Sequence, residues 1–534
     1  MRKLYPCYRV HPALPVNRSR DFIVTPIHAM PARLPAHSLA AIAAGVFLLS
    51  SCGGGGGGDS ATTADVAAPA APATASNVAQ VFTGPAGADG WTQCADEGEV
   101  CATPGVRQVR YGGDGKFAYL NVDGPVGCNN AAFGDPAFGV VKRCQYAAPG
   151  TVAAGMPAHV RAASGRVLSV GPGRAYAKPC DALTTAADGD TVEIDASGSY
   201  DGDVCAFHAN DLTIRGVNGR PKIGANGRYA WGKGIWVITG KRAIVDNVEL
   251  WGARVPDRNG AAIRLDGTHL TVRNSFFHDN ENGILTANDG QSDILIENSE
   301  FGHNGNGSGS SHNLYIGKVA SLTFRYSYSH DADVGHNLKS RAMVNTIVAS
   351  RFSSTRPGDA GSTASGEPSY EIDLPNAGTA YLIGNVIQQP SRNQNSNLVS
   401  FGVEGASNPG RNLYVINNTF LNDDSSNGMF ILVGGEVKTP VLVQNNVFAG
   451  TGDITRQSVA VLKDNFRSLA PAFVNRAGYD LRPAAGAAFI GSGSAPGFSA
   501  SGVSLSPVEE YAHVAGRKAR AFNGKWDIGA YSAN

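Results

Sequence analysis

The stretch V-D-N-V-E-L, from Val245 to Leu250, contains the pattern that decides the fold. The pattern is an apolar residue, any residue, Asn or a small residue, two further residues, and a second apolar residue. It returns as V-R-N-S-F-F from Val272, I-E-N-S-E-F from Ile296, V-I-N-N-T-F from Val415 and V-Q-N-N-V-F from Val443. Looser copies begin at Phe324, Ile347 and Leu382, so that successive copies lie 23 to 35 residues apart. A recurring period of this size indicates a solenoid of stacked repeats.

Each period contains two or three short alternating segments separated by Gly, Asn or Asp. One period, for example, runs from Ala262 to Leu265, turns at Asp266 and Gly267, and continues from Leu270 to Val272. No helical period fits between these segments, and the motif of leucine-rich repeats is absent. The pattern therefore predicts an all-β fold for residues 166–534, a single-chain right-handed parallel β-helix of about 9–11 coils.

One polar position recurs within the pattern. It is occupied by Asn247, Asn274, Asn298, Asn417 and Asn445. We expect these side chains to stack at a turn and to bond one another and the turn backbone, because strands cannot satisfy those backbone groups. The position is thus predicted to be structural.

The composition excludes several classes of protein. The chain has 534 residues, with 44 Lys plus Arg and 44 Asp plus Glu, and therefore a formal net charge of zero. Binding to nucleic acid through bulk electrostatics is not expected from such a balance. Charged residues make up only 16% of the chain, which argues against a coiled coil.

The N-terminal region is similar to an export signal. The apolar run from Leu39 to Leu49 is too short to span a bilayer, and it ends in L-S-S-C at Cys52. This resembles a bacterial lipoprotein signal, in which the cysteine becomes the lipidated first residue. We therefore expect a signal region over 1–51, with Met30 as an alternative start, and a Gly/Ala/Pro tether over 52–85. The expected location is the bacterial cell envelope, with the lipid as the one contact to the membrane.

Six cysteines remain in an exported chain, an even number that fits three disulfides. Six cysteines allow 15 connectivities, and proximity favours Cys94–Cys101, Cys128–Cys144 and Cys180–Cys205 because short loops close at the least entropic cost. Residues 86–147 are predicted to form a small disulfide-bonded β module, followed by a linker over 148–165. Aromatic residues of this module, Trp91, Tyr111, Phe117, Tyr119 and Tyr146, either stack on sugars or form its core.

The repeat is broken between about residues 308 and 405. Four opening strands there read S-S-H-N-L-Y-I-G from Ser310, G-H-N-L-K-S-R-A from Gly335, S-Y-E-I-D-L-P-N from Ser369 and N-L-V-S-F-G-V-E-G from Asn397. Strand alternation directs their apolar residues inward, namely Leu314, Ile316, Leu338, Ile372 and Leu374.

The intervening polar residues are then expected on one exposed face, because adjacent coils are about 4.8 Å apart. They are Asn313, Tyr315, Asn337, Lys339, Arg341, Glu371 and Asp373, with His312, His330 and His336 at the rim. Inserts at 304–311, 354–368 and 388–397 are predicted to form the walls of a groove.

Residues 165–534 resemble the secreted right-handed parallel β-helix, or pectate-lyase-like, superfamily. The resemblance rests on V-G-P-G from Val170, G-D-T-V from Gly189, the N-x-x-F coils and W-D-I-G-A-Y from Trp526. It implies the fold, which hosts lyases, hydrolases, epimerases and adhesins. The paired-aspartate pattern of polygalacturonase-type hydrolases is not found, and S-H-D-A-D from Ser329 replaces the D-P-H-D of mannuronan C5-epimerases.

An acidic polysaccharide suits the predicted face, and enzymes of this fold commonly cleave such substrates by β-elimination. Lys339 is the predicted base, with its pKa lowered by Arg341, and Arg341 would pair with the substrate carboxylate. Glu371 and Asp373 are the predicted ligands of Ca²⁺. The remaining roles are proton donation by Tyr315, His312 or His336, and substrate binding by Asn313, Asn337, His330 and Glu404.

Three alternatives stay open at this stage. The same face would support glycoside hydrolysis or C5-epimerisation, with Glu371, Asp373 or Glu404 as acid and base. A monomeric non-catalytic carbohydrate binder or adhesin would use the solenoid as a stiff rod. Finally, the charged residues would be an ordinary ladder of ion pairs between coils.

Overall fold

The computed structural model describes residues 91–103, 106–123, 126–133, 136–137, 139–147, 165–353, 366–391 and 393–533. The predicted signal region, the predicted lipidation site Cys52, the predicted tether and residues 148–164 of the predicted linker lie outside these ranges. Residues 354–365 of one predicted groove wall also lie outside them. Within the described ranges, no helix is long and apolar enough to cross a bilayer.

The N-terminal module is a small antiparallel sheet. Its strands, in the order β1-β6-β3-β4, are β1 (Trp91–Asp96), β6 (Arg143–Ala147), β3 (Val106–Gly113) and β4 (Lys116–Asp123). Strand β2 (Val100–Cys101) pairs with β5 (Val126–Gly127), and α1 (Asn130–Phe133) follows. The disulfides Cys94–Cys101 and Cys128–Cys144 lie in its core, and they are two of the pairs that proximity favours.

Among the described aromatic side chains of the module, the expected core role is confirmed for two. Tyr111 and Tyr146 are buried in its core. Trp91 and Phe117 are half-buried and lie on either side of Arg110, whose guanidinium carbon is 4.5 and 4.4 Å from the two ring centroids. The guanidinium thus occupies one face of each ring.

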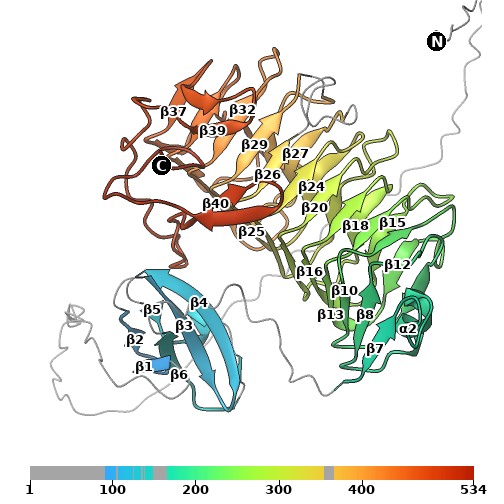
Figure 1. Cartoon of the computed structure of the whole chain (residues 1–534). Helices are drawn as coiled ribbons and strands as arrows, with labels where there is room; N and C mark the ends of the chain where they lie inside the picture. The colour runs from blue at the N-terminus through green and yellow to red at the C-terminus, as the bar shows by residue number, and fades with distance from the viewer. Residues whose placement is uncertain are drawn as a thin grey trace, which may run out of the picture. The chain divides into compact units, whose positions relative to one another are not determined.

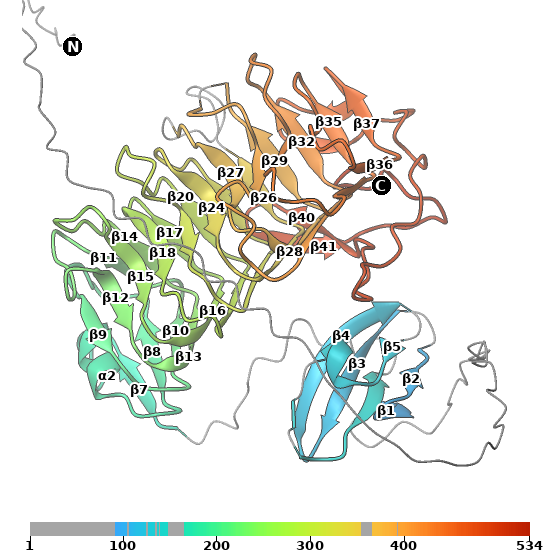
Figure 2. The same cartoon turned by 180° about the vertical axis from the view of Figure 1, so that it is seen from behind.

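The described residues between 165 and 468 form a parallel β-helix with three long sheets, and most coils contribute one strand to each (Figures 1 and 2). We call the nine-stranded sheet sheet 1, the twelve-stranded sheet sheet 2 and the ten-stranded sheet sheet 3. The predicted parallel β-helix is thereby confirmed. Because sheet 1 has nine strands, the described residues form nine complete three-strand coils.

The strand bounds follow the chain order within each sheet. Sheet 1 contains β9 (Cys205–Phe207), β12 (Gly234–Ile238), β15 (Ala261–Leu265), β18 (Asn282–Thr286), β21 (Leu314–Ile316), β24 (His336–Ser340), β27 (Tyr370–Leu374), β30 (Val399–Phe401) and β33 (Ile431–Val433). Sheet 2 contains β7 (Val167–Val170), β8 (Thr191–Asp195), β10 (Thr213–Val217), β13 (Lys241–Asp246), β16 (Thr268–Arg273), β19 (Asp293–Glu297), β22 (Ser321–Arg325), β25 (Val344–Val348), β28 (Gly378–Ile383), β31 (Arg411–Ile416), β34 (Leu442–Gln444) and β36 (Val461–Lys463). Sheet 3 contains β11 (Lys222–Gly224), β14 (Glu249–Trp251), β17 (Phe276–His278), β20 (Glu300–Gly302), β23 (Tyr328–His330), β26 (Arg351–Ser353), β29 (Val386–Gln389), β32 (Thr419–Asn422), β35 (Val447–Ala449) and β37 (Phe466–Ser468).

The recurring asparagines lie at the corner between sheets 2 and 3, but they form no continuous ladder of side chains. All five have φ between 51° and 59°, in the left-handed region that Asn tolerates better than most residues. One bond joins two of them, from Asn445 Nδ2 to Asn417 Oδ1 at 3.3 Å. The expected mutual bonding is therefore wrong for most of the row, and the backbone conformation explains the recurrence of Asn.

The hydrogen-bonded ladder is formed by the next residue of the motif. In successive coils the side-chain oxygen of this residue accepts a hydrogen bond from the backbone N–H of its counterpart in the preceding coil, with N-to-O distances of 2.8 to 3.2 Å. The acceptors are Ser275, Ser299, Ser327, Ser350, Asn385, Asn418, Asn446 and Asn465. The ladder thus satisfies backbone donors at the corner, where the turn interrupts the pairing of strands between coils.

The first coils of the solenoid and parts of the outer faces of sheets 2 and 3 are covered by other parts of the chain. Helix α2 (Pro179–Thr185) packs against the first coils (Figure 1) and is joined to β9 by the disulfide Cys180–Cys205. Beyond β37, short strands form the pairs β38 (Phe473–Asn475) with β39 (Asp480–Pro483) and β40 (Glu509–Ala512) with β41 (Gly516–Ala519). The tail also packs Leu505 on the outer face of sheet 2 and Ala530 on that of sheet 3.

Replacing one member of the ladder tests its contribution to stability. Asn418→Ala removes bonds to the Asn385 and Asn446 side chains and to the Leu382 carbonyl oxygen. Leaving these buried groups unpaired is expected to cost about 2–4 kcal/mol, measured as a lowered midpoint of chemical denaturation. The control Asn523→Ala changes an exposed residue, and equal midpoints for the two variants would contradict the role of the ladder.

Candidate functional site

The irregular coils contribute β21, β24, β27 and β30 to sheet 1. Their apolar residues lie in the core as predicted, and Leu314, Ile316, Leu338, Ile372 and Leu374 are all buried. The register aligns Tyr315 with Lys339, Lys339 with Asp373, and Asp373 with Ser400. Tyr315, Lys339 and Asp373 thus share the outer face of sheet 1, on neighbouring strands as the alternation predicts.

Lys339 is held between two carboxylates. Its Nζ is 2.7 Å from Asp373 Oδ2 and 2.7 Å from Glu404 Oε1. Asp373 is buried and also accepts a hydrogen bond from Ser400 Oγ. Glu404 lies in the turn after β30, and its side chain is 45% exposed, so solvent reaches this partner of the lysine.

Arg341 completes the cluster. It donates from Nε to Tyr315 Oη at 2.8 Å, from Nη1 to Asn376 Oδ1 at 2.6 Å and from Nη2 to Glu404 Oε2 at 2.6 Å. The two oxygens of Glu404 therefore bridge Lys339 and Arg341. We call Tyr315, Lys339, Arg341, Asp373 and Glu404 the cation-bridge cluster.

The predicted activation of Lys339 is wrong. Burial acts to lower the pKa of Lys339, but the charge of Asp373 and the hydrogen bonds to Asp373 and Glu404 outweigh it and raise the pKa above its ordinary value. The lysine is accordingly charged in this arrangement. It can neutralise a carboxylate, and it is not prepared to accept a proton.

Two histidines form a stacked column beside this cluster. The rings of His312 and His336 are 4.7 Å apart, and each Nδ1 accepts a backbone N–H from the next coil, of His336 and Tyr370 respectively. Burial lowers the pKa of His336 to about 4, against the opposing charge of Asp373, whose Oδ2 is 3.4 Å from His336 Nε2. Burial and nearby positive charge lower the pKa of His312 well below its usual value. Both rings are therefore neutral at pH 7, with the remaining proton on Nε2.

Asn313, Asn337 and Glu371 do not lie on the exposed face, and this prediction is corrected. Asn313 Nδ2 donates to Asn337 Oδ1 at 2.9 Å, and Asn337 Nδ2 donates to Glu371 Oε2 at 2.5 Å. All three are at most 1% exposed. They stand at the beginning of their strands, where the preceding corner covers them, as the bond from Asn313 Nδ2 to the His330 carbonyl oxygen shows.

The predicted Ca²⁺ ligands are likewise not brought together as a cluster. Glu371 ends the buried amide chain, and burial raises its pKa well above the usual range, whereas Asp373 pairs with Lys339. Among the described residues, the one group of three possible ligands with suitable spacing is His303, His330 and Asp331. His330 belongs to β23 of sheet 3, so its predicted place at the rim of the sheet 1 face is also wrong.

A polar hollow of about 580 Å³ lies among the loops next to the later coils. Part of its wall comes from the insert at 388–397 that the sequence predicts as a groove wall. Its lining is Glu367, Ser391, Asn393, Gln394, Asn395, Ser396, Asp424 and Ser426. Amides, hydroxyls and two carboxyl groups line it, which suits a hydrated polar ligand.

Comparisons with known proteins give limited matches. No protein-family model matches the chain. A stretch of 63 residues, 11% of this chain, is 41% identical to an uncharacterized protein of Acanthamoeba polyphaga mimivirus and spans 30% of the length of that protein. Among solved structures, pectate lyase Pel9A is similar with a TM-score of 0.46 and 17% sequence identity, over 66% of this chain and 89% of that one. The fold of this chain is shown by its own sheets, and its chemistry must be inferred from its own side chains.

The buried Glu371 predicts a dependence of stability on pH. With its pKa raised above 4.5, the folded state keeps a proton that the unfolded state loses, so Glu371 lowers stability increasingly as the pH rises above 4.5. Glu371→Gln removes this titration and still offers an oxygen to Asn337. We expect its melting temperature, relative to wild type, to be higher at pH 7 than at pH 4. A difference between variant and wild type that is independent of pH would contradict a neutral Glu371.

Proposed function

We propose that this protein binds a uronate-containing polysaccharide on the outer face of sheet 1 and cleaves it by β-elimination. The observation that carries the proposal is the bridge formed by Glu404, whose two oxygens lie 2.7 and 2.6 Å from Lys339 and Arg341. A carboxylate already fits between these two cations. A uronate carboxylate presents the same pair of oxygens and would replace that of Glu404.

Exchange of the Glu404 carboxylate for a uronate carboxylate would leave the net charge of the cation-bridge cluster unchanged. Lys339 would retain its buried partner Asp373, whereas the more exposed Glu404 would turn into solvent. Neutralisation of the uronate group by Lys339 and Arg341 stabilises the negative charge that develops when the adjacent C5 proton is removed. Lys339 and Arg341 would thus supply the positive charge for which the sequence predicts Ca²⁺.

Tyr315 is the proposed group for proton transfer. Its oxygen accepts a hydrogen bond from Arg341 Nε at 2.8 Å, so it lies beside one of the two cations proposed to hold the uronate carboxylate. After losing its own proton to solvent, the Tyr315 oxygen would take the C5 proton, the C–H electron pair would form the C4–C5 double bond, and the C4–O glycosidic bond would break. The phenol would then return the proton to the departing oxygen.

The geometry favours elimination over hydrolysis. A hydrolase requires one carboxyl group as acid and another as nucleophile or base. Glu371 is enclosed in the amide chain, and Asp373 and Glu404 both pair with Lys339.

We also propose that Cys52 is lipidated and that the protein is therefore located at the cell envelope. This part of the proposal is supported by the L-S-S-C sequence that ends at Cys52.

Binding of uronate oligosaccharides tests the bridge. Arg341→Ala is expected to weaken binding by about tenfold or more, because a charge-assisted pair is lost. Glu404→Ala is expected to tighten it severalfold, because the competing carboxylate is removed. Calorimetric titration measures both, with Arg325→Ala as control, since Arg325 pairs with Glu297 on sheet 2. If Glu404→Ala weakened binding as Arg341→Ala does, the bridge would not be the substrate site.

Turnover is tested by the ultraviolet absorbance of the unsaturated product on a panel of uronate polymers. Tyr315→Phe is expected to lower the rate of this absorbance change by about 100-fold or more, while oligosaccharide binding is retained. New reducing ends without absorbance would establish hydrolysis instead. Binding without any product from the wild-type protein would leave a carbohydrate binder and refute elimination.

A further inference from the structure

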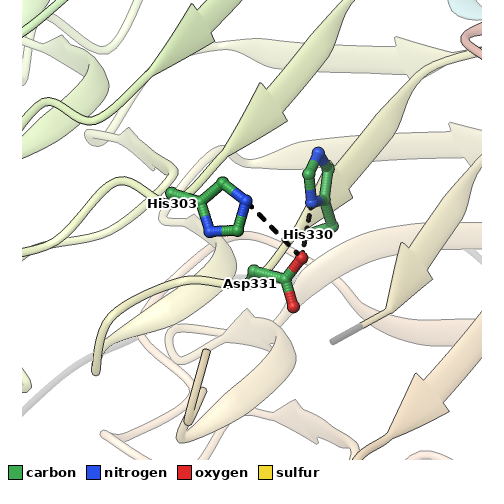
Figure 3. Close-up of side chains that lie close together, drawn as sticks. All are labelled: His303, His330 and Asp331. Carbon is green, nitrogen blue, oxygen red and sulfur yellow. Dashed lines mark hydrogen bonds and ion pairs between the residues drawn. The ribbon is translucent and has the colours of Figure 1, made fainter. Parts of the chain in front are cut away.

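Two histidine rings, at the corner that follows sheet 3, converge on the carboxylate of Asp331. His330 and Asp331 are adjacent in the chain, and His330 Nδ1 is 2.7 Å from Asp331 Oδ2. His303 comes from the preceding coil, with its Nε2 4.0 Å from the same oxygen. Figure 3 shows both rings directed at the Asp331 carboxylate.

The spacing of these atoms is close to that of a metal site. One ligand atom from each residue lies within 4.8 Å of the others. With bonds of about 2.0–2.1 Å, the ligands of a tetrahedral Zn²⁺ are about 3.3 Å apart. The separations of 2.7 and 4.0 Å lie on either side of that value, and small rotations of the side chains would equalise them.

The surroundings add support that is independent of this spacing. His330 Nε2, the ring nitrogen that faces away from Asp331, is 3.2 Å from Glu300 Oε1. A carboxylate at this position is typical of metal-binding histidines, because it fixes the tautomer and the direction of the ring. Gly302 leaves room for the His330 ring, since a Cβ there would lie 2.6 Å from it.

We propose that His303 Nε2, His330 Nδ1 and the Asp331 carboxylate bind one divalent transition-metal ion of the Zn²⁺ class. Two imidazoles select such a metal over Ca²⁺, which prefers a shell of oxygen ligands. Binding releases the proton that lies between His330 and Asp331. The partly exposed His303, at 17% against 2% for Asp331, provides the route of entry.

Such an ion would join two successive coils. His303 follows β20, His330 ends β23 and Asp331 follows it, so the metal would fix the corner that leads into β24. The carbonyl oxygen of His330 accepts from Asn313, and the N–H of Ala332 donates to Asn337 Oδ1. The site is therefore one hydrogen bond away from the buried amide chain, and its proposed role is to stiffen that corner.

A neighbouring pair provides a matched control. His278 and Asp279 repeat the arrangement, with Nδ1 to Oδ2 at 2.6 Å and Glu249 Oε1 at 3.4 Å from Nε2. Asp279 is 58% exposed, and the pair belongs to no group of three possible ligands among the described residues. His278→Ala therefore removes a similar ion pair without touching the proposed ligands.

The experiment uses the full chain, stripped with a chelator and titrated with Zn²⁺, with Co²⁺ as a spectroscopic probe. One equivalent of Zn²⁺ should bind and raise the melting temperature. His303→Ala and Asp331→Asn should each weaken binding by at least about 100-fold, and Glu300→Gln by roughly tenfold. His278→Ala should bind as wild type does. The Co²⁺ spectrum should show nitrogen ligation that is lost in His303→Ala.

The outcomes separate the proposal from an ordinary ion-pair cluster. Absence of Zn²⁺ and Co²⁺ binding by the wild-type chain would overturn it. Binding that survives both His303→Ala and Asp331→Asn would also overturn it, because the metal would then bind elsewhere. Equal losses in His278→Ala and His303→Ala would show a general effect on the corner. Because His303 is partly exposed, we expect His303→Ala to fold, and circular dichroism of this variant checks that it does.

Discussion

The structure depends on one hydrogen bond, from a backbone N–H to a side-chain oxygen of the next coil, that is repeated at the corner between sheets 2 and 3. A residue in the left-handed conformation turns the chain there, and at the N–H of the next residue the turn interrupts the pairing of strands between coils. A buried donor without a partner would cost about 1–3 kcal/mol in every coil. The hydroxyl of Ser275, Ser299, Ser327 or Ser350, or the amide of a later Asn, supplies the acceptor from the following coil. That bond holds the corner of each coil against the corner of the next coil, and so helps to keep the strands of successive coils in register.

A fixed register allows distant residues to form one cluster. Lys339 is 34 residues from Asp373 and 65 from Glu404 in the chain, yet the stacking of β24, β27 and β30 brings all three together. Tyr315, Lys339 and Asp373 lie in strands, whereas Arg341 and Glu404 lie in the segments that follow β24 and β30. The carboxylate that the proposed exchange would displace is thus the partly exposed one, on a turn.

The sequence predicts the parts that depend on period and neighbourhood. The coils, the inward row from Leu314 to Leu374, the disulfide pairs and the outward row of Tyr315, Lys339 and Asp373 all follow from alternation, spacing or loop length. The sequence also carries the signal for the ladder, because Ser or Asn directly follows four of the five recurring Asn residues, as Ser275, Ser299, Asn418 and Asn446. The signal is weak because two residue types share the position and Val248 occupies it once.

The features that the sequence does not predict depend on contacts between coils. Alternation placed Asn337 and Glu371 outside because it takes no account of the corner that covers the beginning of a strand. The pKa of Lys339 was expected to fall beside Arg341, since Glu404 and Asp373 become neighbours only through the fold. His303 carries no local motif, and it meets Asp331 only because consecutive coils align their corners.

The most direct test of carbohydrate recognition is a crystal structure of the protein soaked with a uronate oligosaccharide. We predict a substrate carboxylate at about 2.7–3.2 Å from Lys339 Nζ and from the Arg341 guanidinium, with Glu404 turned into solvent and Asp373 still paired with Lys339. A sugar bound elsewhere, with Glu404 still bridging the two cations, would contradict the assignment of this face as the substrate site.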